Sequence, residues 1–223
     1  MNKKFNIAPE GYSIIMSIIL FVIILNVLDY LFNISFLNIL NIILCLFLLI
    51  SLYFFRDPTR ILKQDNGVTF LSPADGKILS IKNVKDPEIG DSLKIAIFLS
   101  FFNVHRQWIP YNAKVLDVFY NTGKFFGAFK DKASMNNEQT SIVFENKDGH
   151  IYKIKQIAGF VARRIINHMK PDLLVNQGDK LGFIRFGSRV EIIVPSNFIL
   201  MVNKGEKVRG CQTVIGKFSD SYS

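Results

Sequence analysis

The feature that most constrains this chain is an apolar stretch over residues 12–55, in which Asp29 is the only charged residue. Two apolar runs, 14–28 and 34–55, are separated by a short polar break. The second run is long enough to cross a hydrocarbon core of roughly 30 Å as a helix, and the first is at the short end of that range. We therefore expect a helical hairpin embedded in a membrane.

Basic residues lie outside both ends of this stretch: Lys3 and Lys4 before it, and Arg56, Arg60 and Lys63 after it. The turn between the two apolar runs contains none. By the positive-inside rule, both ends and the domain that follows lie on the cytoplasmic face of the inner membrane. A cleaved signal peptide is the alternative, but no small-residue cleavage site follows the first run and a second run comes directly afterwards. Because Pro58 should end the helix, we divide the chain into a hairpin (1–56) and a domain (57–223).

The formal net charge of +9 belongs entirely to residues 56–223, because two lysines and two acids cancel in residues 1–55. A basic domain beside a bilayer is attracted to anionic lipid at about 1 kcal/mol per well-placed Lys or Arg. No helix-turn-helix, zinc-finger or RNA-recognition motif is present, so we expect an anionic membrane surface as partner and no nucleic acid. Cys45 lies in the apolar stretch and Cys211 near the far end of the chain, so they are poor disulfide partners, which fits a reducing compartment. They also show no metal-ligand spacing, so we expect no metal site.

Beyond Pro58 the apolar pattern changes to the alternation that is typical of β-strands. Strands are expected over residues 92–100, 113–121, 139–145, 151–157 and 189–194, with a turn at 147–149 and a short helix within 158–169. The predicted fold class is therefore α+β and mainly β: a membrane hairpin followed by a β-rich domain that resembles a sandwich or barrel.

Two segments, 175–182 and 202–210, share a Gly-acid-Lys-apolar core followed by another Gly. This form is typical of turns in sandwich-like barrels of the biotinyl and lipoyl type. It supplies a non-enzymatic alternative, a membrane-tethered carrier or adaptor that remains uncleaved. A carrier needs an exposed lysine at a hairpin tip, and Lys147 qualifies weakly because the usual flanking Met is missing. This alternative ranks below an enzyme.

The dipeptide Gly187-Ser188 lies between two strand-like runs and opens the last 36 residues of the chain. A serine hydroxyl is a poor nucleophile unless a base activates it, but this one has the Gly187 carbonyl next to it. Attack on that carbonyl would convert the amide to an ester, and glycine tolerates the strained backbone that such a turn needs. The chemistry also requires a base, a group that orients the base, and donors for the oxyanion.

Among the three histidines, His105 is the best candidate base because it directly follows a strand-like run. His150 follows a tight turn and is interpreted as a solvated strand residue, and His168 is interpreted as exposed. Asp75, in a Pro-Ala-Asp-Gly-Lys sequence, is the candidate acid, although an ordinary turn aspartate is the common role in such a sequence. Asp75, His105 and Ser188 act together only if the fold brings them together.

These residues together resemble the phosphatidylserine decarboxylase family, specifically its short proenzyme type. The resemblance covers nearly the whole chain to Gly210. Each of its segments is weak alone, and their order is specific: 54–58 (FFRDP), 72–77 (SPADGK), 103–105 with Pro110, 123–138, 158–159 with 162–165, and 187–188.

The resemblance implies cleavage between Gly187 and Ser188 into a β chain, 1–187, and an α chain, 188–223, which stay associated. Ser188 would become an N-terminal pyruvoyl group, the covalent cofactor. The substrate would be phosphatidylserine, whose amine forms a Schiff base with the pyruvoyl carbonyl before CO2 leaves, and the product would be phosphatidylethanolamine. Asp75 and His105 match the acid and base of self-cleavage, and His105 also matches a decarboxylation residue.

The chain departs from the family pattern at two positions. Family members commonly carry Asp where this chain has Asn103, and long-form members have a second His at the position of Trp108, which leaves His105 to serve both steps. The basic residues Arg106, Arg163 and Arg164 could face lipid phosphate or solvent.

Two alternatives remain open at this stage: a pyruvoyl decarboxylase of another amino-acid substrate, and the uncleaved adaptor. The oligomeric state is open too, and a homo-oligomer is compatible with the sequence.

Overall fold

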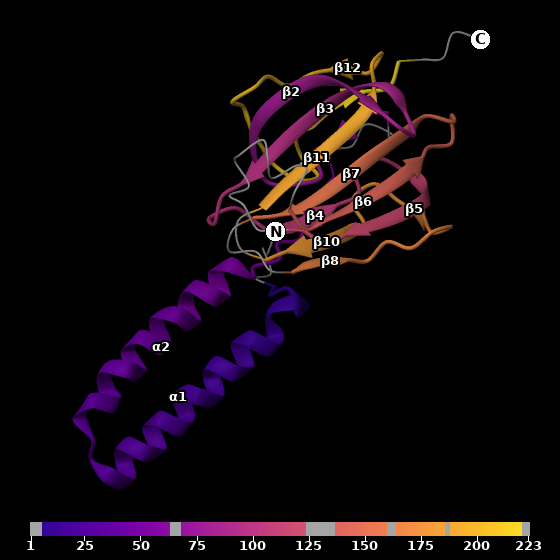
Figure 1. Ribbon diagram of the computed structural model, residues 1–223. Coiled ribbons are helices and arrows are strands. Elements are labelled where there is room, and N and C mark those ends of the chain that lie inside the picture. Colours follow the sequence, from indigo (N-terminus) through magenta and orange to yellow (C-terminus); the bar gives the residue numbers. More distant parts are fainter. Residues whose placement is uncertain (1–5, 63–67, 124–136, 160–163, 186–187, 220–223) are drawn as a thin grey trace. The chain divides into compact units, whose positions relative to one another are not determined.

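The structure is a computed structural model that describes residues 6–62, 68–123, 137–159, 164–185 and 188–219. It divides into two compact units, residues 1–59 and 60–223. The first contains the short 3-10 helix η1 (Pro9–Gly11) and the helices α1 (Tyr12–Phe32) and α2 (Ser35–Phe54) (Figure 1). Both α-helices are long and apolar enough to cross a membrane.

The first helix is longer than the apolar run predicted. Asp29 lies inside α1, and the chain turns only at Asn33, whose φ of 50° is left-handed. Asparagine tolerates that conformation better than most residues. The α-helices are apolar around their whole circumference, and few of their side chains are buried. A helix with this character suits a lipid environment.

Backbone contacts join the two ends of the hairpin. The N–H of Ala8 donates to the carbonyl of Phe55 (2.7 Å), and the N–H of Asp57 donates to the carbonyl of Asn6 (2.7 Å). Both ends of the helical pair therefore emerge on the same side.

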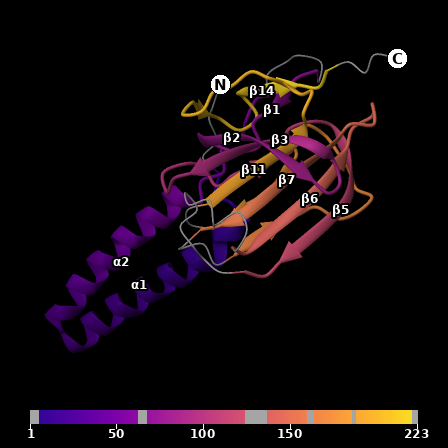
Figure 2. The same cartoon turned by 45° about the horizontal axis from the view of Figure 1, so that its top comes forward.

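The second unit is mainly β. Its described strands are β1 (Phe70–Leu71), β2 (Gly76–Asp86), β3 (Gly90–Leu99), β4 (Arg106–Trp108), β5 (Ala113–Asn121), β6 (Gln139–Glu145), β7 (Ile151–Ala158), β8 (Ile165–Asn167), β9 (Leu174–Val175), β10 (Lys180–Ile184), β11 (Ser188–Pro195), β12 (Ile199–Leu200), β13 (Lys207–Val208) and β14 (Val214–Lys217). They form an eight-stranded antiparallel sheet in the order β13-β2-β3-β11-β7-β6-β5-β9 and two three-stranded sheets, β4-β10-β8 and β1-β14-β12. The large sheet curls, and β11 lies near its middle between β3 and β7 (Figures 1 and 2).

The strands predicted from alternation are confirmed as β3, β5, β6, β7 and β11. The short helix predicted within 158–169 is wrong where the chain is described, because Ala158 ends β7 and Ile165–Asn167 forms β8. Strand β8 pairs with β10. Two β-branched isoleucines with a partner strand available favour extended backbone, so tertiary pairing overrode the local pattern.

The two segments of similar sequence do form the same turn. Gly178 and Gly205 each have a φ of 90°, and each turn begins with an Asn whose N–H bonds to the carboxylate three residues later. The backbone N–H of Gly178 donates to the carbonyl of Ile109, and that of Gly205 donates to the carbonyl of Ile78. The repeated pattern therefore encodes a structural turn.

Aromatic rings fill one part of the core. Phe70 packs against Tyr111, Tyr152, Phe198 and Phe218, with ring centroids 5.2 to 6.3 Å apart. Tyr152 is fully buried and its hydroxyl donates to the carbonyl of Tyr111. This position raises the pKa of Tyr152 well above its ordinary value, because burial disfavours the phenolate.

His150 differs from its prediction as a solvated strand residue. It is partly buried and stacks on Phe218, with ring centroids 4.8 Å apart.

A buried ion pair lies at the β2–β3 turn. The carboxylate of Asp86 accepts hydrogen bonds from the N–H groups of Glu88 and Ile89 and lies 2.6 Å from the ammonium of Lys153, which also contacts the Glu88 carboxylate. Burial alone would raise the pKa of Asp86. The hydrogen bonds from Lys153 and Glu88, together with the positive charge of Lys153, outweigh burial and lower that pKa below its ordinary value of 3.8.

Candidate active site

Ser188 is the first residue of β11 and pairs with Leu99 on β3 and Ala158 on β7. Its side chain alternates onto the same face as Val190 and Ile192, both of which belong to the core. The residue is fully buried, and its hydroxyl has no hydrogen-bond partner among the described residues. An unpaired buried hydroxyl is costly and uncommon, which makes this atom a candidate for chemistry. Gly187 lies outside the described residues.

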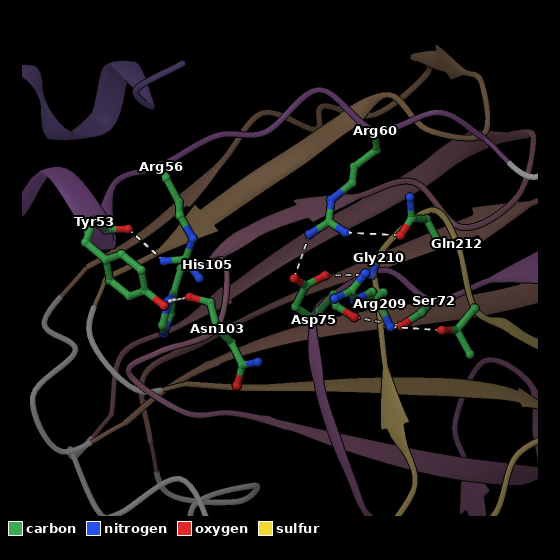
Figure 3. Close-up of polar contacts among 12 residues, drawn as sticks. Tyr53, Arg56, Arg60, Ser72, Asp75, Asn103, His105, Arg209, Gly210 and Gln212 are labelled. Carbon is green, nitrogen blue, oxygen red and sulfur yellow. Dashed lines mark hydrogen bonds and ion pairs between the residues drawn. The ribbon is translucent and has the colours of Figure 1, made fainter. Parts of the chain in front are cut away.

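His105 is fully buried just before β4. Its Nδ1 lies 3.0 Å from the backbone carbonyl of Asn103 (Figure 3). Because a carbonyl oxygen only accepts, Nδ1 carries the hydrogen in the neutral ring and Nε2 is the basic nitrogen. The side chain of Asn103 holds the preceding turn by accepting from the N–H (2.9 Å) and hydroxyl (2.7 Å) of Ser100. Asn103 therefore orients the histidine through its backbone, a role that needs no carboxylate.

Asp75 immediately precedes β2 and has a side chain that is 11% exposed. One carboxylate oxygen lies 2.6 Å from the guanidinium of Arg60, and the other accepts from the N–H of Gly210 at 2.8 Å (Figure 3). Among the described residues these are its only hydrogen-bond partners. Asp75 therefore ties the approach to β2 to the segment around Gly210.

The fold brings the three predicted site residues to one end of the large sheet. Ser188 pairs with Leu99, and the turn that leads to His105 begins directly after Leu99. Lys77 pairs with Phe98, which places Asp75 at the same end. The described hydrogen bonds do not join Asp75 to His105 or Ser188, so the structure gathers the three residues without assembling a bonded triad.

Trp108 is a packing residue at this end of the domain. It is 3% exposed, its backbone N–H donates to the carbonyl of Pro73 (2.9 Å), and Gly210 lies against its indole ring. The guanidinium of Arg60 lies 5.3 Å from its ring centroid. The nearby thiol of Cys211 is buried, and this burial raises its pKa to about 12.

The three arginines predicted to face lipid or solvent differ in position. Arg106 is 1% exposed, and its guanidinium lies 5.3 Å from the ring centroid of Phe183, so its side chain faces the interior. Arg164 is exposed at the start of the β8 segment. Arg163 lies outside the described residues.

Sequence reasoning missed two buried glutamines. Gln107 donates to the backbone carbonyl of His105 at 2.6 Å, and Gln156 donates to Gln107 at 2.9 Å. One signal was available: Gln156 interrupts the apolar face of β7, where Ile154 and Ala158 belong to the core. A polar residue at a core position often marks a functional site.

A buried ion pair next to Ser188 was missed as well. Arg189 and Glu191 are at most 1% exposed, and their charged groups lie 2.7 Å apart. Because side chains alternate along a strand, this pair lies on the opposite face of β11 from Ser188. It is therefore not positioned to act as a base for the serine hydroxyl.

The sequence is similar to proteins of one known family. The sequence model of the family described as phosphatidylserine decarboxylase matches residues 47–216. The chain is 42% identical over 172 residues to the phosphatidylserine decarboxylase proenzymes of Rickettsia typhi (strain ATCC VR-144 / Wilmington) and Rickettsia prowazekii (strain Madrid E). These matches cover 75% of this chain and 74% of each relative.

Proposed function

Because the chain belongs to the phosphatidylserine decarboxylase family, we propose that it converts phosphatidylserine to phosphatidylethanolamine with a pyruvoyl group made from its own Ser188. The observation that carries this proposal is the buried hydroxyl of Ser188 at the start of β11, which has no hydrogen-bond partner in the part of the chain that the structure describes. A serine that packed for structure alone would be expected to satisfy that hydroxyl.

Self-cleavage needs no reagent other than water. The Ser188 oxygen attacks the carbonyl carbon of Gly187, its proton passes to a base, and the amide nitrogen leaves as the amine of an ester. Removal of the Ser188 α-proton then expels the Gly187 carboxylate and leaves dehydroalanine. Its imine tautomer adds water and loses ammonia, which produces the pyruvoyl end. The β chain, 1–187, therefore ends in a carboxylate and the α chain, 188–223, begins with a ketone.

His105 is the proposed base. Its Nδ1 hydrogen is committed to the Asn103 carbonyl, so Nε2 is the atom that accepts a proton. For Asp75 we propose a positioning role, since its carboxylate is bonded to Arg60 and Gly210. The Asp75–Gly210 bond would join the β chain to the α chain after cleavage.

Strand pairing supports the proposal that the two chains stay together. The α chain would contain β11, which pairs with β3 over eight residue pairs and with β7 over six. It would also contain β13 and β14, which pair with β2 and β1. A fragment with a central strand of the sheet cannot leave without exposing the core on both sides of that strand.

The pyruvoyl group would supply a ketone that binds the substrate amine covalently and takes up the electron pair left when CO2 departs. His105 is the proposed donor of the proton that replaces the carboxylate. The apolar surroundings of Ser188, including Leu99 and Val190, would exclude bulk water from this step.

A bilayer location would suit a phospholipid substrate, because its acyl chains need not leave the membrane. The two apolar helices and the basic charge of the remaining chain support this location. Exposed Arg164 is a candidate contact for the lipid phosphate, and the basic residues flanking the hairpin favour the cytoplasmic face.

The deciding experiment is the intact mass of the purified protein. We expect two chains that break after Gly187, the smaller lighter than a serine-started peptide by the mass of one ammonia. Ser188→Ala should leave one chain, and Ser196→Ala is the matched control because this exposed serine directly follows the same strand. A wild type that decarboxylates while remaining one chain would refute the proposal.

Substrate and cofactor have separate tests. Borohydride added with phosphatidylserine should trap an adduct on the α chain, and an active protein that never traps one contradicts the pyruvoyl chemistry. Turnover of phosphatidylserine but not free serine is expected. The reverse preference would favour a pyruvoyl decarboxylase of a soluble amino acid.

A further inference from the structure

Two glutamine side chains form a chain of amides that ends at His105. The Nε2 of Gln156 donates to Oε1 of Gln107, and the Nε2 of Gln107 donates to the backbone carbonyl of His105. Both glutamines are fully buried. Gln156 lies on β7 of the large sheet and Gln107 on β4 of a small sheet, so the amides connect two separately hydrogen-bonded layers.

Gln156, the glutamine farther from His105 in this pair, lies beside Ser188. Ser188 pairs with Ala158, and Gln156 is two residues earlier on β7, where its side chain shares the inner face. Such diagonal neighbours have Cα atoms about 7–8 Å apart, within reach of a long side chain. The Oε1 of Gln156 has no hydrogen-bond partner among the described residues, and neither does the Ser188 hydroxyl. Two unpaired buried oxygens on one face indicate a site that does more than pack.

Gly182 has no side chain, which leaves space for the amide of Gln156. Gly182 pairs with Gln107, and a Cβ atom there would lie 2.7 Å from Nε2 of Gln156 and would also strike the backbone oxygen of Ile166. The small residue therefore permits the close approach of β10 to the Gln156 amide.

We propose that Gln107 and Gln156 are positioning residues for His105. The Asn103 carbonyl holds the imidazole, while Gln107 and the N–H of Ile184 hold the His105 backbone carbonyl. Together these contacts fix where Nε2 lies relative to Ser188. A displacement of about 1 Å can cost about a hundredfold in rate, so loss of the amide donor slows both self-cleavage and decarboxylation. The inference rests on the proposed function, because it assigns His105 a proton-transfer role.

The test compares Gln107→Met with Gln107→Glu in the full chain. Methionine keeps the shape and removes the donor, and we expect at least about a tenfold slower cleavage and turnover per folded protein. A neutral glutamic acid still donates through its O–H, whereas a carboxylate cannot, and burial raises the pKa of such an acid. The ratio of the Gln107→Glu rate to the wild-type rate should therefore rise as the pH falls from about 8 to about 6.

Other groups around Gln107 titrate or carry charge, and the ratio to wild type cancels their contribution. They are His105 and Arg106 beside it, Lys180 on β10, His168 after β8, and Lys153 and Lys155 on β7, both alternating to the face opposite Gln156. Emission from Trp108 measures the folded fraction.

Gln177→Met is the matched control, because the Gln177 amide donates to the backbone carbonyls of Thr69 and Pro110 away from His105. We expect it to lower stability and leave the rate per folded protein unchanged. Gln107→Met within about twofold of wild type, or a Gln107→Glu ratio that is flat with pH, overturns the inference. An uncleaved, inactive wild type would instead overturn the proposed function.

Discussion

The contact between Arg60 and Asp75 provides a quantitative test of how this end of the domain is held together. Both side chains are 11% exposed and their charged groups lie 2.6 Å apart, so water screens the pair only partly. A hydrogen bond to a charged group contributes about 1.5–3 kcal/mol to stability. Arg60→Met leaves Asp75 with the Gly210 N–H alone, while Asp75→Asn leaves a buried cation without its counter-charge.

We expect each single substitution to lower the free energy of unfolding by about 2–3 kcal/mol, and the double variant to lose about 1.5–2 kcal/mol less than the sum. For a domain of this size, 2–3 kcal/mol corresponds to a drop in Tm of about 5–10 °C. Denaturant unfolding in detergent, followed by Trp108 emission, is the assay. It is best performed in a Ser188→Ala background, which we expect to remain one chain. Additive losses, within about 0.5 kcal/mol, would refute the reasoning.

The same variants test the role of Asp75 in self-cleavage when Ser188 is retained. If Asp75 acts by positioning, Arg60→Met and Asp75→Asn should slow cleavage to a similar extent. Cleavage that stops in Asp75→Asn and continues at the wild-type rate in Arg60→Met would instead assign Asp75 a direct role.

Three further predictions concern single residues. Because burial raises the pKa of Cys211 to about 12, its thiol in a Cys45→Ser background should react with a disulfide reagent at pH 8 roughly a thousandfold more slowly when folded than in urea; prompt labelling of the folded protein contradicts this. Asp86→Asn should cost about 1–3 kcal/mol at pH 7. Because the Asp86 pKa is lowered on folding, this difference from wild type should shrink progressively as the pH falls below about 4, and a difference at pH 3 as large as that at pH 7 argues against the ion pair. Gly182→Ala should cost about 1–3 kcal/mol by overpacking and slow self-cleavage; unchanged Tm and cleavage would show that β10 can move aside.

Local patterns in the chain were strong enough to reveal the apolar hairpin and the main strands. Alternation predicted β5 because Ala113 and Val115 face the core while Lys114 and Leu116 are exposed, and that pattern is visible in a short window of sequence. Strand β8 could not be predicted in this way. Its three residues become a strand only because β10 lies beside them.

The sequence by itself determined which chemistry is available: a serine after a glycine, a histidine after a strand, and two helices apolar enough for a bilayer. Only the tertiary structure decided how these groups are held. In the tertiary structure the Asp75 carboxylate bonds to Arg60 and Gly210, and the His105 ring bonds to the Asn103 carbonyl. Two glutamines from different sheets also bond to each other next to His105. The physical reason is that hydrogen bonds between residues such as Gln107 and Gln156, far apart in the chain, depend on strand order and register. Those in turn follow from burial of the whole core, which no single segment specifies.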